Sequence, residues 1–118
     1  MEYTFDTNDR PFRAIKAGTK KVEGRTPTDS DKTPYDEIKS GDLLTIINNS
    51  TNESLKVRVK FVHHYPNAKK MLEKEDPKNV LSSEIKTVEV GIEIYNSLSG
   101  YEEGIKKNGI YAIGLELL

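Results

Sequence analysis

Two cations and one carboxylate lie close together in the first quarter of the chain, in the pattern Gly18-x-Lys20-x-x-Glu23-x-Arg25. A lysine held away from water can serve as a base, and a partly buried glutamate can activate water or hold an ammonium group. An arginine fork suits a carboxylate, a phosphate or the edge of a base. The block therefore predicts a ligand-binding site formed by Lys20, Glu23 and Arg25, with Lys20 and Glu23 as candidate catalytic residues.

Two kinds of function fit this block, and so does a purely structural role. Water could attack an amide with Glu23 as the base and Lys20 stabilising the oxyanion. Glu23 could instead accept a hydrogen bond from the exocyclic amine of cytosine, which is binding without chemistry. Lys21, Glu23 and Arg25 could also form a solvated strand face, whose ion pairs contribute little to stability. The residues by themselves leave these three interpretations open.

A second cationic candidate lies in residues 54–65, where Lys56, Arg58 and Lys60 alternate with apolar residues. Alternate residues of a strand lie about 6.6 Å apart on one face. That spacing is near the separation of successive phosphates along a single strand, so the three side chains are candidate contacts for a nucleic-acid backbone. A polar outer strand face is the structural alternative.

Tyr35 and His64 are further candidates for contacts with a bound base. Tyr35 lies in a long Pro-containing loop, where it could close over a cleft, and His64 lies beside Tyr65, where it could stack on or bond to a base. His63 and His64 cannot bind one metal ion together, because adjacent strand residues point to opposite faces. Since the chain has no cysteine and no suitably spaced third ligand, we expect no metal site, and nothing implies a cofactor.

The composition is that of a globular protein with little net charge. Of the 118 residues, 31% are charged and 35% are hydrophobic, with a formal net charge of −1. This length predicts one domain, residues 1–118. A sequence pI near 6.1 favours a nucleoside-sized ligand or a short RNA end over long nucleic acid. The chain has no cysteine, signal-peptide core or membrane-length apolar run, so we expect a cytoplasmic monomer with no membrane partner.

The N-terminal half predicts short strands around one helix. Asp9 is a candidate N-cap for a helix with Pro11 in its first turn, and Gly18 is placed as its C-cap. Residues 42–48 and 54–65 predict an antiparallel hairpin, in which Leu55, Val57, Val59 and Phe61 would share one face. The remaining elements expected here are a strand at 3–5, an extended segment at 20–25 and a helical turn at 35–38.

The C-terminal half predicts helices followed by one apolar strand. Asn67 and Thr87 are candidate N-caps for two of the helices. The expected helices lie within residues 67–76, 77–81, 87–98 and 100–109, and the strand within 110–118. The whole pattern predicts a mixed α+β protein with a sheet of four to six strands, and a closed or half-closed barrel would remove exposed sheet edges.

Several stretches, taken in order, resemble the ASCH domain family. They are "PFRAIKAGTKKVEGR", "IKSGDLLTI", "FVHHYPNAKKMLEKE" and "YAIGLEL", and together they span almost the whole chain. The most specific part is the block of Gly18, Lys20, Glu23 and Arg25, supported by Gly41-Asp42 before a strand. The resemblance implies a PUA-like fold, a small β-barrel of about five to six strands with flanking helices, and a cleft beside the block that binds RNA or a modified nucleotide.

The resemblance also implies a possible activity, as an alternative to binding. One bacterial branch of the family is a metal-independent amidohydrolase that removes acetyl from N4-acetylcytidine, with the lysine of the block as base and a threonine three residues later as nucleophile. Here Lys20 and Arg25 are kept, but the threonine position is Glu23. The further catalytic glutamate of that branch has no matching position in this chain, so the resemblance does not by itself assign an enzyme activity.

Overall fold

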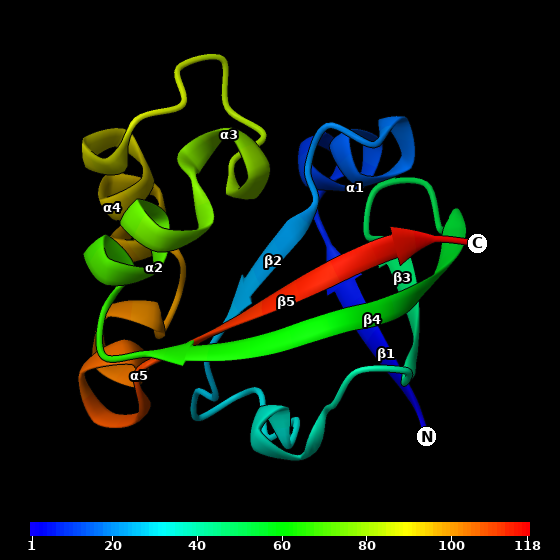
Figure 1. The fold of residues 1–118 in the computed structure, drawn as a ribbon, viewed down its shortest axis with the longest axis horizontal. Coiled ribbons are helices and arrows are strands. Elements are labelled where there is room, and N and C mark those ends of the chain that lie inside the picture. The colour runs from blue at the N-terminus through cyan, green and yellow to red at the C-terminus, as the bar shows by residue number, and fades with distance from the viewer.

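The computed structural model describes all residues, 1–118, as one curled five-stranded sheet with helices at its side and end (Figure 1). In chain order the elements are β1 (Glu2–Thr7), α1 (Asp9–Ala17), β2 (Val22–Arg25), a 3₁₀ turn (Tyr35–Glu37), β3 (Leu43–Asn48), β4 (Ser54–Tyr65), α2 (Ala68–Glu75), α3 (Pro77–Val80), α4 (Val88–Ser97), α5 (Tyr101–Asn108) and β5 (Ile110–Leu117). The predicted mixed α+β class is confirmed, and the sheet is a half-barrel that fits a small PUA-like fold.

The strands follow the order β1-β3-β4-β5-β2, so β1 and β2 are the two edges of the sheet. β1 pairs with β3 in parallel, and the other neighbours are antiparallel. The hairpin predicted from residues 42–48 and 54–65 is the β3–β4 pair. Because the sheet curls, its two edges come to face each other, and this seam between β1 and β2 is where the candidate site lies.

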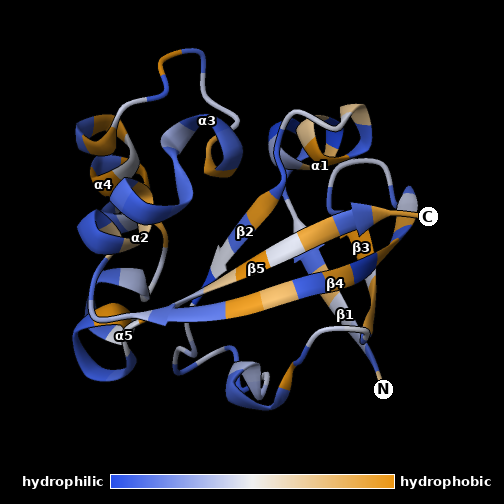
Figure 2. Ribbon diagram, in the orientation of Figure 1, coloured by the Kyte–Doolittle hydropathy of each residue, from blue (hydrophilic) through white to orange (hydrophobic).

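Two hydrophobic clusters hold the sheet between its flanking elements (Figure 2). The first includes Phe5 of β1, Phe12 of α1 and Tyr35 of the 3₁₀ turn. The second includes Leu72 of α2 and Tyr95 of α4, packed against β2 and β5. The helices that follow β4 therefore cover the end of the half-barrel formed by β2 and β5. Helix α1 packs against the part that contains β1 and β3.

β4 alternates between buried and exposed side chains as predicted, up to an irregularity in its pairing with β5. Val57 and Val59 are buried, and Lys56, Arg58 and Lys60, which alternate with them, are exposed. The register shifts between Val59 and Phe61. The prediction that Phe61 shares the face of Leu55 is therefore wrong: Leu55 packs against the first cluster and Phe61 against the second.

The ends of α1 fix how the chain enters β2. Asn8, not Asp9, holds the N-cap position, and Asp9 is the first helical residue, so that prediction was displaced by one residue. Gly18 is the C-cap, as predicted, in the left-handed conformation with φ 83°. Its N–H returns to the carbonyls of Ala14 and Ile15, and this reversal sets Lys20 at the entrance to β2. The predicted caps Asn67 and Thr87 are also confirmed, since each accepts a hydrogen bond from the first helical turn.

Candidate functional site

The seam of the half-barrel leaves backbone groups on both edge strands without a strand partner. The N–H of Leu115 donates to the carbonyl of Lys21, so in an antiparallel ladder the peptide groups of Val22 and Gly24 point away from β5 and into the seam. Across the gap, Arg25 Nη2 donates to the carbonyl oxygen of Asp6 at 2.8 Å. A side chain, rather than a ladder of backbone hydrogen bonds, therefore links β1 to β2.

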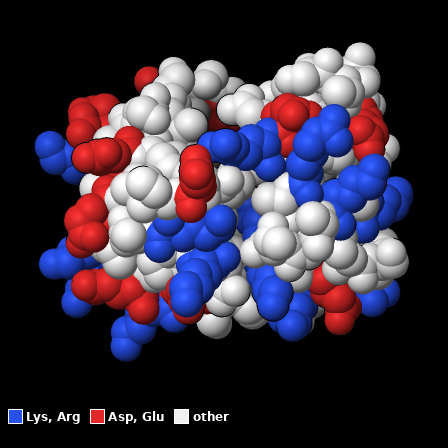
Figure 3. Space-filling view, turned by 90° about the horizontal axis from the view of Figure 1, so that it is seen from above, with Lys and Arg blue, Asp and Glu red and all other residues white.

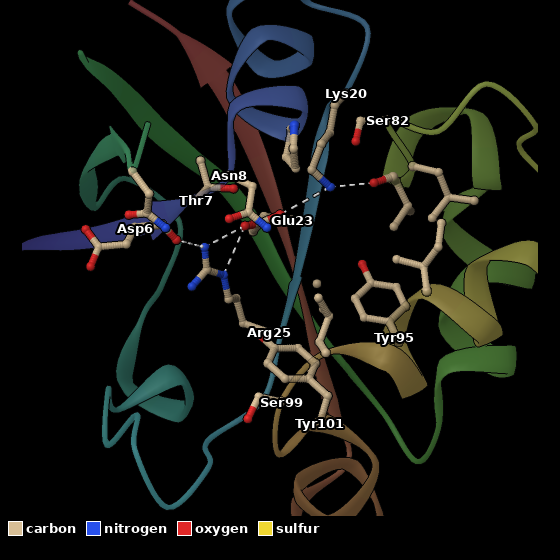
Figure 4. Close-up of a pocket in the computed structure, with 17 residues that line it drawn as sticks. Asp6, Thr7, Asn8, Lys20, Glu23, Arg25, Ser82, Tyr95, Ser99 and Tyr101 are labelled. Carbon is tan, nitrogen blue, oxygen red and sulfur yellow. Dashed lines mark hydrogen bonds and ion pairs between the residues drawn. The ribbon is translucent and has the colours of Figure 1, made fainter. Parts of the chain in front are cut away.

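A cavity of about 370 Å³ lies along this seam (Figure 4). This volume lies within the range typical of small-molecule sites. Its walls come from the end of β1, the start of α1, β2, the residues around the end of α3, and the α4–α5 region. The lining residues that carry polar side chains or aromatic rings are Asp6, Thr7, Asn8, Lys20, Glu23, Arg25, Asn49, Ser82, Tyr95, Ser99 and Tyr101.

The predicted block lies in this cavity as one ion-paired network. Glu23 Oε1 is 3.1 Å from Lys20 Nζ, and Glu23 Oε2 accepts hydrogen bonds from Arg25 Nε at 2.9 Å and Nη2 at 2.8 Å. The side chains of Lys20, Glu23 and Arg25 are only 5%, 8% and 13% exposed. The interpretation of these charges as a solvated strand face is therefore wrong for Glu23 and Arg25, although Lys21 is exposed.

Lys20 is held as an ammonium group by three acceptors. Besides the Glu23 carboxylate, its Nζ donates to the carbonyl of Val22 at 2.8 Å and to the carbonyl of Val80 in a very short hydrogen bond. An amine has only two hydrogens to give, whereas an ammonium has three. The three acceptors therefore require the ammonium form of Lys20. Its hydrogen bond to Val80 also links the start of β2 to the end of α3.

The charge of Glu23 is stabilised in spite of its burial. Burial on its own would raise the pKa of Glu23, but the Lys20 ammonium and the Arg25 guanidinium outweigh it and hold the pKa below its ordinary value. For Arg25 the two effects have the opposite signs: burial would lower its pKa, but the Glu23 carboxylate outweighs burial, and the pKa of Arg25 is raised. Glu23 and Arg25 are thus both charged at neutral pH.

Two polar atoms in the network keep hydrogen-bonding capacity for a ligand. Glu23 Oε1 has the Lys20 ammonium, at 3.1 Å, as its only partner, and a carboxylate oxygen can accept two hydrogen bonds. Arg25 donates from Nε and Nη2, and its Nη1 has no hydrogen-bond partner in the protein. The central carbon of the same guanidinium lies over the ring of Phe5, 4.7 Å from its centroid, in a cation–π contact.

Tyr95 and Tyr101 form an aromatic wall that the sequence did not reveal. Their rings are stacked with centroids 6.2 Å apart, and both line the cavity (Figure 4). Burial raises the pKa of Tyr101 to about 12 and raises that of Tyr95 further, so both phenols are neutral. Gly24 is the one feature of the sequence that could have indicated this wall, because a glycine inside a strand often marks a place where another group comes close to the backbone. A β-carbon at Gly24 would collide with the Tyr95 hydroxyl.

The other predicted contact residues lie away from the cavity. Tyr35 is 1% exposed in the first hydrophobic cluster, and its hydroxyl donates to Asp31. His64 is exposed, and its Nε2 is 2.7 Å from the carbonyl oxygen of Asn108. His63 interacts with Glu75 instead, and no group of three or more potential ligands stands ready for a metal ion.

The predicted cationic row on β4 is exposed but mostly paired with acids. Lys56 Nζ lies 3.2 Å from Glu2, and Arg58 Nη1 lies 3.5 Å from Glu116. Only Lys60 has no acidic partner within ion-pair distance, and it lines a second, smaller cavity together with Lys21.

A comparison with models of protein families tests the resemblance to ASCH domains that the sequence suggested. The ASCH domain matches residues 6–118, which is nearly the whole chain. The chain belongs to the ASCH domain family. No helix of this ASCH domain has the length and apolar character needed to cross a bilayer.

Two solved structures of archaeal ASCH-type proteins have the same fold over their full length. The crystal structure of hypothetical protein PH0355 matches with a TM-score of 0.80 and 34% identity, and the match covers 100% of both chains. The solution structure of protein PF0455 from Pyrococcus furiosus matches with a TM-score of 0.73 and 36% identity, covering 100% of this chain and 98% of the other. No functionally curated protein matches this ASCH domain.

The buried network predicts a large stability loss for Glu23→Gln. This change leaves the charges of Lys20 and Arg25 buried with no carboxylate between them, so we expect the free energy of unfolding to fall by about 3–5 kcal/mol. Urea unfolding at pH 7 measures the difference. Glu53→Gln is the matched control, because Glu53 also pairs with a lysine, at 2.6 Å, but lies at the surface. A loss no larger than that of the control would contradict the structural role.

The pH dependence of that loss follows from the lowered pKa of Glu23. A carboxylate whose folded-state pKa lies below its unfolded value, here near 4.5, contributes stability that is fully present above that value. The contribution disappears as the pH falls through the folded-state pKa. We therefore expect the wild type and Glu23→Gln to converge in stability as urea unfolding is repeated below pH 4.5. A difference that is constant across this range would contradict the assignment of a charged Glu23.

Proposed function

We propose that the seam pocket binds the base of a modified nucleoside or nucleotide, free or at a short RNA. One observation carries the proposal: a buried, fully charged network forms one wall of a cavity of about 370 Å³, and it still offers Glu23 Oε1 as an acceptor and Arg25 Nη1 as a donor. The family membership supports it, because ASCH domains have a PUA-like fold associated with nucleic-acid-related binding.

The pattern of groups in the cavity matches the edge of a base. A base presents amine hydrogens and carbonyl or ring-nitrogen acceptors side by side, which Glu23 and Arg25 can meet together. An aromatic ring such as that of Tyr101 offers a surface for a base to lie against. The hydroxyls of Ser82 and Ser99 can both donate and accept, so they can adapt to a sugar or to a substituent on the base.

The charges that line the cavity favour an uncharged group over a phosphate. Lys20 and Arg25 are balanced by Glu23 and Asp6, so the formal charges of the lining residues cancel. A phosphate would be placed beside the Glu23 carboxylate with no spare cation to compensate it. The proposal therefore keeps Lys20, Glu23 and Arg25 as the site and assigns no contact to Tyr35 or His64, which lie outside the cavity.

Amide hydrolysis is a second candidate, favoured by the contact of Lys20 with Glu23 in the pocket wall. It would need Glu23 to take a proton from water as the oxygen attacks the amide carbonyl, with the C–N bond breaking to release an amine and a carboxylic acid. The lowered pKa of Glu23 makes it a weak base, and Lys20 Nζ is already engaged by two carbonyl oxygens and the Glu23 carboxylate. Binding without turnover is therefore the stronger proposal.

The pocket can be filled without disturbing the network, and this provides the test. Ser82→Phe introduces a ring into the cavity, and Ser83→Phe makes the same change one residue later, where the side chain does not line the cavity. Calorimetric titration with N4-acetylcytidine and cytidine should show binding by the wild type and by Ser83→Phe. We expect Ser82→Phe to bind at least about tenfold more weakly, since the ring occupies the ligand's volume.

Three results would overturn parts of this proposal. Binding of neither nucleoside by the wild type would contradict the base-binding pocket. Equal binding by the two phenylalanine variants would place the ligand elsewhere on the molecule. Chromatography of the same mixtures tests the second candidate: release of cytidine from N4-acetylcytidine, lost in Glu23→Gln but not in Glu53→Gln, would replace binding by hydrolysis as the function.

A further inference from the structure

A second cleft, of about 270 Å³, lies beside the seam pocket and carries cations that have no acidic partner. It is lined by Gly18 and Ile15 at the end of α1, by Lys21 and Lys60, and by the last residues of β5. Neither Lys21 nor Lys60 takes part in any ion pair of the structure, and both are exposed. Glu116, the acid in the cleft wall, is already paired with Arg58.

Two contacts place this cleft directly next to the pocket. Lys20 lines both cavities, so only the chain around it separates them. The N–H of Lys21 donates to the carbonyl of Asn79 at 2.8 Å, which sets Lys21 against α3. Lys78, the neighbour of Asn79, is a third exposed lysine without an ion-pair partner. We call Lys21 and Lys60, which line the cleft, the cleft lysines.

The surface charge agrees with this placement. Figure 3 looks down on the face that carries α1 and α3. It shows Lys and Arg side chains gathered across the middle of this face and toward α1, with some acidic side chains beside them, and further acidic side chains on the side of the other helices. The overall net charge of −1 does not reveal this local gathering of cations. A locally basic surface of this kind attracts a polyanion at short range, inside the screening distance of about 10 Å at moderate salt.

We propose that the cleft lysines bind the phosphate backbone of a single-stranded RNA next to the nucleotide whose base enters the seam pocket. The inference rests on the proposed function. It places the base of the ligand in the seam pocket and the phosphates of the same ligand in the cleft. The neutral base occupies the pocket, whose lining charges cancel, and the phosphates lie where unpaired lysines can neutralise them. Lys60 is the one residue of the predicted β4 row that this backbone path retains, because Lys56 and Arg58 are paired with acids.

The double variant Lys21→Ala/Lys60→Ala tests the inference. The probes are a fluorescein-labelled single-stranded RNA of about ten nucleotides with one central N4-acetylcytidine, and free N4-acetylcytidine. Fluorescence anisotropy should show RNA affinity at about 0.1 M salt reduced by about tenfold or more, and the slope of log affinity against log salt should become shallower by about 1.4. Affinity for the free nucleoside should stay unchanged, because neither side chain lines the pocket.

Lys69→Ala/Lys70→Ala is the matched control, since it removes two exposed lysines from α2, which lines neither cavity. Equal loss of RNA affinity in both double variants would overturn the cleft as a specific path. Binding of the nucleoside without any RNA binding would overturn the cleft and leave the pocket standing. RNA binding that needs the cleft lysines, with no nucleoside binding, would instead overturn the pocket and retain the cleft. Binding of a poly-glutamate peptide through the same lysines, but not of RNA, would make the partner an acidic protein.

Discussion

The buried carboxylate of Glu23 is the interaction on which the rest of the seam depends. It holds Lys20 on one side and Arg25 on the other, and each of these cations then ties β2 to a different part of the molecule. Lys20 reaches the carbonyl of Val80 at the end of α3, and Arg25 reaches the carbonyl of Asp6 on β1. Without the carboxylate, two cations would repel each other in a site that water barely reaches, and both links would be lost.

This arrangement explains why the half-barrel carries a pocket at all. A sheet that closed through backbone hydrogen bonds between β1 and β2 would leave no cavity along the seam. Here a side chain spans the gap, so a space remains that the α4–α5 region covers with Tyr95 and Tyr101. The network is thus both a structural closure and the polar wall of the site, which couples the stability of the fold to the chemistry of the pocket.

Local patterns in the sequence predicted the elements well, because caps, turns and alternation depend on near neighbours. Gly18 ends α1, and Val57 and Val59 alternate with exposed cations, as expected. The features that the sequence predicted wrongly or missed depend on long-range packing. The register shift in β4 redirects Phe61, and the stacking of Tyr95 on Tyr101 over Gly24 follows from how α4 and α5 dock on β2, which no short window encodes. Glu2 and Glu116, distant in sequence, likewise pair with Lys56 and Arg58, two of the three cations in the row expected on β4.

The central claim is that a base enters the seam pocket, and a nuclear magnetic resonance titration of the isotopically labelled protein with N4-acetylcytidine tests it most directly. Backbone amide shifts report where a small ligand sits without altering any residue. The account predicts shifts concentrated at Gly24, Arg25, Ser82 and Ser99, which line the pocket from three separate segments. Shifts confined to the exposed face of β4, or none at a saturating nucleoside concentration, would contradict it.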